Sequence, residues 1–267
     1  MNKKIIVLAV LVLIVLGVVG YKLYYKPNPV ATTNTTGKLG EILKRGEMIV
    51  GTDATYAPLE SKDAQGNIVG MDIDIVKQIA ADMGVKVTFK DIPWDNLFQS
   101  IQNGDVDMSI SAITITAERA QTLGFSDPYF NAGQVMVALA NTKHIINTPL
   151  DLKGLKISAQ INTTGEVQAK KYASSPSLVS NFEEYAKAQS DLINGKFDVM
   201  IIDYPAALSM VAKDKRLAIK GDIFTQEFYG VATQKNQPDL LLKINDTIRR
   251  LKQDGTLKQI EDQWLVQ

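Results

Sequence analysis

Apolar positions along this chain follow two spacings in turn, one typical of buried strands and one typical of amphipathic helices. Between residues 72 and 83 the apolar side chains fall at positions 73, 75, 76, 79, 80 and 83, which places them on one face of a helix. The segments 48–52 and 85–89 on either side of it are short and largely apolar, as buried strands are. Strands that alternate with helices predict a mostly parallel sheet covered by helices, an α/β fold.

The alternating pattern lapses in a polar connection near residues 138–149 and then begins again, so two α/β lobes are expected. The first set of elements is predicted at 39–45, 48–52, 59–63, 68–70, 72–83, 85–89, 94–102 and 107–111. The second set is predicted at 156–159, 165–172, 182–193, 199–202 and 204–212, before a strand at 231–233 and helices at 239–253 and 257–264. Each lobe has about 100 residues, an ordinary domain size. The cleft between two such lobes is a natural ligand site.

The N-terminus has the pattern of an export signal. Lys3 and Lys4 precede an unbroken apolar run at 5–20, which is typical of a secretory signal peptide or a membrane signal anchor. We favour the anchor for residues 1–26, because the small residues that precede a cleavage site are poorly matched and the run extends to about 20 residues, enough to cross a membrane. Residues 27–37 (PNPVATTNTTG) are predicted to be a flexible tether. The rest of the chain is expected outside the cytoplasm.

Charge and composition exclude several classes of partner and cofactor. Lysine plus arginine and aspartate plus glutamate number 29 each, but the first 37 residues hold four lysines and no acid. Residues 38–267 are therefore acidic by four charges, which disfavours nucleic acid as a partner. The chain has no cysteine, so disulfides, thiolate metal sites and cysteine nucleophiles are excluded. His144 is the single histidine, which excludes a histidine-rich metal site, and no metal or cofactor is predicted.

Polar residues follow two predicted strands of the first lobe, where ligands bind in open parallel sheets. Asp53 could hold a cationic or amide group while Tyr56 stacks on its carbon chain, although an aspartate that caps a helix or lies in a turn and a half-buried tyrosine are the commoner fates. In the segment SAITITAER, Thr114, Arg119 and free backbone N–H groups suit a carboxylate. A surface arginine paired with a neighbouring acid explains that segment about equally well.

The second lobe offers similar loops. INTTGEV carries Thr163 and Thr164 at a strand-to-helix turn, where they could face an anion or simply cap the helix; the turn lacks the lysine and the spacing of a nucleotide-binding loop. Asp203 follows an apolar strand, so it could accept hydrogen bonds from a ligand ammonium or cap the next helix. In the first lobe, Trp94 of the segment IPWDNLF could be an aromatic wall of the cleft or a core residue. Spacing alone favours the structural role for each of these residues.

Taken together, these segments resemble the polar amino-acid-binding proteins of ABC importers, the family-3 extracellular solute-binding proteins. The matching segments run in the order of the family over nearly all of residues 38–267: GTDATYAPLESKDAQGNIVGMDIDI, PWDNLFQSIQNGDVDMSISAITITAER, FSDPYF, DLKGLKI, NTTGE, GKFDVMIID and LKQDGTLKQIEDQWL. The resemblance implies the two-lobed periplasmic-binding-protein type II fold, with two hinge strands and the ligand in the cleft. The first lobe would be discontinuous, at 38–138 and 231–267, and 139–230 would form the second lobe with its hinge connections.

The resemblance also implies a role for each candidate residue. Arg119 would bind the α-carboxylate of a free L-amino acid, helped by Thr114 and Thr164, and Asp203 would bind the α-ammonium. Because Arg119 and Asp203 lie on different lobes, one zwitterion could bridge them and shift the hinge equilibrium toward closure.

The same resemblance assigns the ligand side chain to a second group of residues. Tyr56 and Trp94 would sandwich that side chain, and Asp53 would read its far end. The cleft would also be lined by Ser111, Ala112, Gln160 and Thr163. A carboxylate beside two rings suits a long cationic side chain, so arginine is favoured and lysine comes next. Glutamine follows, since its amide can also donate to Asp53.

The function expected from these residues is that of a monomeric extracytoplasmic solute-binding protein, in the periplasm or on the outer face of the cytoplasmic membrane. It would deliver its amino acid to the permease of an ABC transporter. The same fold also serves enzymes of the cyclohexadienyl or arogenate dehydratase type, which would need a proton donor in the cleft, with Glu60 and Glu166 as candidates by position. A sensor domain that acts through the anchor is a third possibility. The intact Asp203 favours amino-acid binding.

Overall fold

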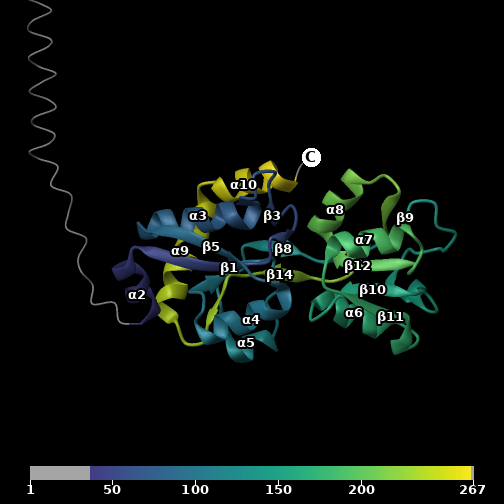
Figure 1. The fold of residues 1–267 in the computed structure, drawn as a ribbon, viewed down its shortest axis with the longest axis horizontal. Helices are drawn as coiled ribbons and strands as arrows, with labels where there is room; N and C mark the ends of the chain where they lie inside the picture. The colour runs from purple at the N-terminus through teal and green to yellow at the C-terminus, as the bar shows by residue number, and fades with distance from the viewer. Residues whose placement is uncertain (1–36, 266–267) are drawn as a thin grey trace, which may run out of the picture. The chain divides into compact units, whose positions relative to one another are not determined.

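The computed structural model describes residues 37–265, which belong to one compact unit. The predicted anchor or signal at 1–26, and all but the last residue of the tether at 27–37, lie outside this part of the chain. Within residues 37–265 no helix combines the length and the apolar character that a membrane span requires. The described elements form two α/β lobes, each around its own five-stranded sheet (Figure 1).

The first lobe is built around a sheet with the strand order β5-β1-β6-β15-β7. Its strands are β1 (Glu47–Thr52), β5 (Lys86–Asp91), β6 (Met108–Ser109), β7 (Leu123–Phe125) and β15 (Ala232–Gln234). The strand β1 is parallel to both β5 and β6, whereas β15 returns from the far end of the chain and pairs antiparallel with β6 and β7. This sheet is therefore discontinuous in sequence, because its fourth strand comes after the whole second sheet.

Six helices accompany the first sheet: α2 (Lys38–Arg45), α3 (Met71–Met83), α4 (Trp94–Asn103), α5 (Arg119–Thr122), α9 (Pro238–Gln253) and α10 (Thr256–Leu265). All six apolar positions predicted for the buried face of the helix at 72–83 are buried in α3, so that prediction is confirmed. A short three-stranded sheet of β2 (Thr55–Tyr56), β3 (Glu60–Lys62) and β4 (Ile68–Val69) includes the expected hairpin.

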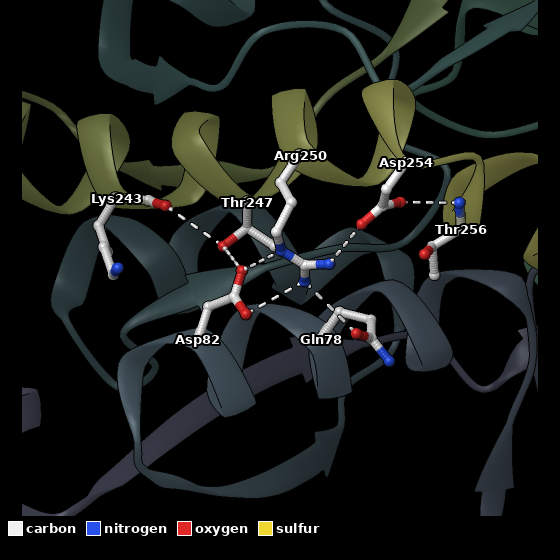
Figure 2. A network of polar contacts seen from close by, with 7 residues as sticks. All are labelled: Gln78, Asp82, Lys243, Thr247, Arg250, Asp254 and Thr256. Carbon is white, nitrogen blue, oxygen red and sulfur yellow. Dashed lines mark hydrogen bonds and ion pairs between the residues drawn. The ribbon is translucent and has the colours of Figure 1, made fainter.

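A polar network joins α9 to α3 and so ties the C-terminal part of the first lobe to its N-terminal part (Figure 2). The guanidinium of Arg250 donates to both oxygens of Asp82, at 2.9 and 3.1 Å, and to Asp254 at 2.9 Å. These side chains are 29–41% exposed, so each pair contributes little. The buried face of α9 contributes more, because its fully buried Ile244 and Ile248 stabilise the fold by about 1.5–3 kcal/mol each.

The second lobe is built around a sheet with the strand order β11-β10-β12-β9-β13. Its strands are β9 (Gln134–Leu139), β10 (Ile157–Gln160), β11 (Val179–Phe182), β12 (Val199–Asp203) and β13 (Leu217–Lys220). Its α-helices are α6 (Thr164–Tyr172), α7 (Tyr185–Ile193) and α8 (Tyr204–Lys213). The strand β10 is parallel to β11 and β12, and β9 runs antiparallel between β12 and β13. The carboxyl ends of β10 and β12 therefore lie at one edge of the sheet.

Two short strands connect the lobes. The strand β8 (Phe130–Ala132) pairs antiparallel with β14 (Glu227–Tyr229) in a two-stranded sheet of their own, between the two larger sheets (Figure 1). We propose that these strands are the two hinge crossings. Since β9 hydrogen-bonds to the second sheet, we also propose a first lobe boundary near residue 133 in place of the predicted 138.

Several element boundaries differ from those expected. The helix predicted at 182–193 begins only at Tyr185, because Phe182 is still in β11 and pairs with Gln160 of β10. The strand predicted at 107–111 is limited to Met108–Ser109, since the chain then turns at Ala112, whose φ is +47°. Backbone that turns away from the sheet cannot continue the hydrogen bonds between neighbouring strands. The turn also brings the residues that follow it to the cleft.

Candidate functional site

One cavity between the lobes is lined by all eleven residues that the sequence pointed to. The space between its atoms, including the open mouth, is about 450 Å³. From the first lobe come Asp53, Tyr56, Trp94, Ser111, Ala112, Thr114 and Arg119. From the second lobe come Gln160, Thr163, Thr164 and Asp203. Many of these residues lie at or just after the ends of strands, or begin the helices that follow, and the resemblance to the family is what brought all eleven together.

A buried carboxylate holds the loop that carries Ala112 against the first lobe. Asp72, at the start of α3, accepts hydrogen bonds from the backbone N–H of Ala112 at 2.8 Å and from the hydroxyl of Tyr129 at 2.8 Å. The left-handed conformation of Ala112 costs about 1–2 kcal/mol for an L-residue. The hydrogen bond to a buried carboxylate offsets part of that cost. The loop is thereby held where Ser111 and Thr114 line the cavity.

Asp203, the last residue of β12, faces the cavity and does not cap α8 with its side chain. Its carboxylate accepts from the hydroxyls of Tyr56 at 3.0 Å and Tyr229 at 2.6 Å, and from the side-chain amide of Gln134. Burial raises the pKa of Asp203 to about 6, against the lowering effect of these three donors, and the negative charge of Glu227 raises it further. At neutral pH the carboxylate is therefore mostly charged, and a cation would stabilise it.

Arg119 projects from the first lobe across the cavity. Its guanidinium donates to the backbone carbonyl of Thr114 at 2.9 Å and to that of Asn162, in the second lobe, at 3.1 Å. The same group lies 5.2 Å from the ring centroid of Trp94 and 4.9 Å from that of Phe98. Burial lowers the pKa of Arg119 to about 10, which still leaves the guanidinium charged at neutral pH. A planar, charged fork in this position can bind a carboxylate through two hydrogen bonds.

Asp53 directly follows β1 and is 7% exposed. Its carboxylate accepts from the hydroxyl of Thr55 at 2.7 Å and from the backbone N–H of Trp94, the first residue of α4, at 3.1 Å. The residue therefore supports the N-terminus of a helix, as the structural alternative held, and also lines the cavity. Burial raises the pKa of Asp53, and a cationic or amide donor in the cavity would favour its charged form.

The aromatic residues Tyr56 and Trp94 both line the cavity, and each also contacts another aromatic ring. The ring of Tyr56 lies 4.6 Å from that of Tyr185, a residue of the second lobe, with 33° between the ring planes. The ring of Trp94 contacts Phe98 edge-on at 4.9 Å and carries the guanidinium of Arg119. In addition, the indole N–H of Trp94 donates to the carbonyl of Asn162 at 3.3 Å. Aromatic contacts therefore help to hold the two lobes together around the cavity.

At the start of α6 the predicted capping role and the cavity position are combined. The hydroxyl of Thr163 accepts from the backbone N–H of Glu166 at 3.2 Å, which makes it the N-cap, and donates to the carbonyl of Gln160. The side chain of Gln160 is held by Tyr185, whose hydroxyl donates to it at 2.8 Å. The hydroxyl of Thr164 instead donates to the carboxylate of Glu227 at 2.6 Å.

Sequence reasoning missed several residues that line the cavity: Gln134, Gly165, Tyr185, Ile201 and Ile202. Glu60, considered only as a proton donor, also lines it. It is fully buried, accepts from the hydroxyl of Ser111 at 2.9 Å, and has a pKa raised well above its usual value by burial and then by the charge of Asp72. Within residues 37–265 no group of three or more histidine, cysteine, aspartate and glutamate side chains is placed to hold a metal ion.

Comparison with known proteins gives a consistent picture. Residues 48–267 match the profile of the bacterial extracellular solute-binding proteins, family 3. The L-cystine-binding protein TcyJ of Escherichia coli (strain K12) is 31% identical over 85% of this chain and 86% of its own. The ABC transporter glutamine-binding protein GlnH of Bacillus subtilis (strain 168) is 34% identical over 81% and 79% of the two chains. A crystal structure of a mutant of ArgBP from T. maritima superposes with a TM-score of 0.82 at 36% identity, covering 86% of this chain and 100% of that one.

Proposed function

The chain belongs to family 3 of the bacterial extracellular solute-binding proteins, and from that premise we propose that it captures one free L-amino acid with arginine as the favoured ligand. The observation that carries the proposal is the position of Arg119 and Asp203, which reach one cavity from opposite lobes. One amino acid could bridge the two residues, because its Cα carries both a carboxylate, which would bind Arg119, and an ammonium, which would bind Asp203. Contacts made to both lobes at once stabilise only the closed form, so binding would drive closure.

The choice of arginine rests on the balance of charge in the cavity. Arg119 is the only cationic residue among the lining residues, whereas Asp53 and Asp203 are acids; a third acid, Glu60, is set apart because burial raises its pKa well above the usual value. A ligand that brings one carboxylate and two cationic groups compensates these charges better than a neutral amino acid does. Lysine satisfies the same balance with a single point charge, and glutamine offers Asp53 an amide donor. The relatives are named for cystine, glutamine and arginine, so the family alone leaves the ligand open.

We further propose that the protein acts as a monomer outside the cytoplasm and delivers its ligand to the permease of an ABC importer. The family description as extracellular solute-binding proteins supports this location, as does the export pattern at the N-terminus. The segment 1–26 would then either anchor the protein to the membrane or be removed after export.

The named relatives do not support an enzymatic role. The curated relatives named above are binding proteins, in agreement with the expectation that the chain is not an enzyme. Glu166, one of the two proton donors considered, forms an ion pair with Lys170 of its own helix at 2.7 Å and accepts from the backbone N–H of Asn162. Hydrogen bonds from Lys170 and Asn162 outweigh burial and lower the pKa of Glu166, which suits a fixed structural carboxylate better than an acid catalyst.

The test is a thermal-shift screen of protein freed of bound ligand by unfolding and refolding, against the twenty L-amino acids. A ligand at 100 times its dissociation constant should add about 2.7 kcal/mol of stability, or roughly 5–11 °C for a chain of this size. Loss of the shift in Arg119→Ala and Asp203→Ala would support the assignment of both anchors. No shift with any amino acid would refute the proposal.

Asp53→Asn decides between a cationic and an amide ligand. Removal of the charge should weaken arginine binding by about 10- to 100-fold, because a contact between two opposite charges becomes a weaker hydrogen bond to a neutral oxygen. Glutamine binding should change by less than about threefold, since the asparagine oxygen can still accept from an amide. Asp105→Asn removes the same charge from an exposed position of the same lobe and should affect neither ligand.

A further inference from the structure

Glu227, in the connecting strand β14, is 8% exposed and lies behind the cavity wall. The backbone places it there, since Thr114 forms an isolated bridge with Tyr229, two residues further along the same strand. None of the ion pairs among residues 37–265 includes Glu227. A buried carboxylate without a cation needs several hydrogen-bond donors, and their identity defines its role.

Two of those donors are hydroxyls that line the cavity from opposite lobes. The Oε2 atom of Glu227 accepts from Thr114 Oγ1 at 3.1 Å and from Thr164 Oγ1 at 2.6 Å. The same oxygen accepts from the side-chain amide of Gln134 at 3.3 Å, and its Oε1 atom accepts from Thr225 Oγ1 at 2.9 Å. One carboxylate oxygen is therefore hydrogen-bonded to residues of both lobes behind the cavity.

The hydrogen bonds to Glu227 decide whether the two threonine hydroxyls can donate to a ligand or only accept from it. A threonine hydroxyl has one proton to donate and two lone pairs to accept with. Because Thr114 and Thr164 both donate that proton to Glu227, only lone pairs remain for a molecule in the cavity. Gln134 also donates to the hydroxyl of Thr164 and to the carboxylate of Asp203, so this hydroxyl and the carboxylates of Asp203 and Glu227 lie around one amide group. This end of the cavity thus presents acceptors, which suits an ammonium with its three N–H groups.

We propose that Glu227 is a positioning residue, which takes the hydroxyl protons of Thr114 and Thr164 and so makes both hydroxyls acceptors for the α-ammonium of the bound amino acid. This inference rests on the proposed function. It also revises the role that the resemblance implied for the two threonine hydroxyls, which would no longer donate to the α-carboxylate. The carboxylate is left to Arg119 and to the backbone N–H groups in the first turn of α6, which have no partner within the helix.

The test compares L-arginine with 5-guanidinopentanoate, the same molecule without its α-ammonium, by calorimetric titration of the refolded protein. Wild-type protein should bind L-arginine much more tightly, and the ratio of the two dissociation constants measures recognition of the ammonium. In Glu227→Ala this ratio should fall by about tenfold or more, the effect of lost hydrogen bonds to a charged group, with little change for the analogue. Glu227→Gln keeps an acceptor oxygen and should retain most of the ratio.

Two further variants keep the inference falsifiable if Glu227→Ala does not fold. Thr114→Val and Thr164→Val remove each hydroxyl at nearly constant volume, and each should lower the affinity for L-arginine but not for the analogue. If both ligands lose affinity equally in these variants, the hydroxyls serve the carboxylate that the ligands share, and the inference is wrong. Asp107→Asn alters another buried carboxylate, remote from the cavity, and should lower the melting temperature while the ratio stays the same.

The outcome also separates this inference from the proposed function. If wild-type protein binds L-glutamine and not L-arginine, the same comparison is made with L-glutamine and 5-amino-5-oxopentanoate. If the wild type binds amino acids and analogues equally, it does not recognise an ammonium, and both proposals are wrong. A large wild-type ratio that persists in every variant overturns only the role of Glu227.

Discussion

Replacement of Asp203 by asparagine should have opposite effects on ligand binding and on the stability of the ligand-free protein. The substitution keeps the shape of the side chain and one oxygen that can accept from Tyr56 or Tyr229. It removes the negative charge that we assign to the α-ammonium. The prediction therefore isolates the charge from the packing around it.

The magnitude on binding follows from the burial of the charge. Loss of one member of a buried, hydrogen-bonded charge pair costs about 2–5 kcal/mol, or roughly 30- to 5,000-fold in the dissociation constant. The ligand-free protein should respond in the other direction. The pKa of Asp203 rises from its usual 3.8 to about 6 on folding, so the stability that the proton contributes is complete below pH 3.8 and is lost as the pH rises through 6. At pH 7 the charged carboxylate thus destabilises the ligand-free fold by roughly 3 kcal/mol, which asparagine relieves in part.

The assay combines calorimetric titration with L-arginine and L-glutamine, and thermal unfolding of the ligand-free protein at pH 7. We expect Asp203→Asn to bind either ligand at least about 30-fold more weakly and to melt at the same temperature as wild type or a few degrees higher. Asp198→Asn, in the same lobe and outside the cavity, should leave binding unchanged. Binding within about threefold of wild type would refute the assignment of Asp203 to the ammonium. A much lower melting temperature would refute the argument from burial.

Further predictions concern pH, the carboxylate anchor and the helix network. The affinity for the amino acid should be about tenfold weaker at pH 5 than at pH 7.5, because only about one Asp203 in ten is then charged; titration at both values checks this. Arg119→Lys should weaken binding by about 10- to 100-fold in the same assay, since the ammonium of lysine cannot form a two-pronged contact or stack on the aromatic rings in the same way. Arg250→Ala should lower the free energy of unfolding by about 1 kcal/mol in a denaturant titration and leave affinity unchanged, because its partners Asp82 and Asp254 are partly exposed.

The parts of the fold that could be predicted from sequence are those whose pattern is complete within one segment. The helix α3 shows every expected apolar position buried, and β1 has the expected apolar character with four of its six residues buried. Of the missed strands, β7, β8, β13 and β14 have three or four residues each, too few for a periodic signal, whereas β9 has six residues, five of them buried, and its apolar run could have been recognised. Such strands exist because a partner strand offers hydrogen bonds to them, as β8 does to β14. The partner strand that makes such a strand possible lies elsewhere in the chain, so the short segment alone does not predict it.

The same distinction applies to the site. Asp53, which directly follows β1, and Arg119, which begins α5, could be named as candidates from their place beyond strands of a parallel sheet, and the resemblance to the family then assigned them to the ligand. Glu227 could not be found in this way, since its partners Thr114 and Thr164 are 113 and 63 positions away. Gln134 is similar, because it reaches Asp203 from a neighbouring strand, 69 positions away in sequence. A polar residue in a connecting strand has no local pattern that separates it from an ordinary loop residue.

Ligand binding in this cavity is an exchange, because its polar groups already have protein partners. Arg119 donates to the carbonyls of Thr114 and Asn162, and a ligand carboxylate would replace neutral acceptors with a charged one. The gain at that anchor is the difference between the two kinds of hydrogen bond, and it is the same for every amino acid. Discrimination between amino acids must then come from cavity groups whose hydrogen bonds within the protein do not fully compensate the cost of their burial. Asp53 is such a group, since it is a buried carboxylate with a raised pKa and is not in any ion pair of the described residues. A side chain that brings a positive charge to Asp53 would relieve that cost, and a neutral side chain would do so only through an amide dipole, which is why we propose a cationic amino acid as the ligand.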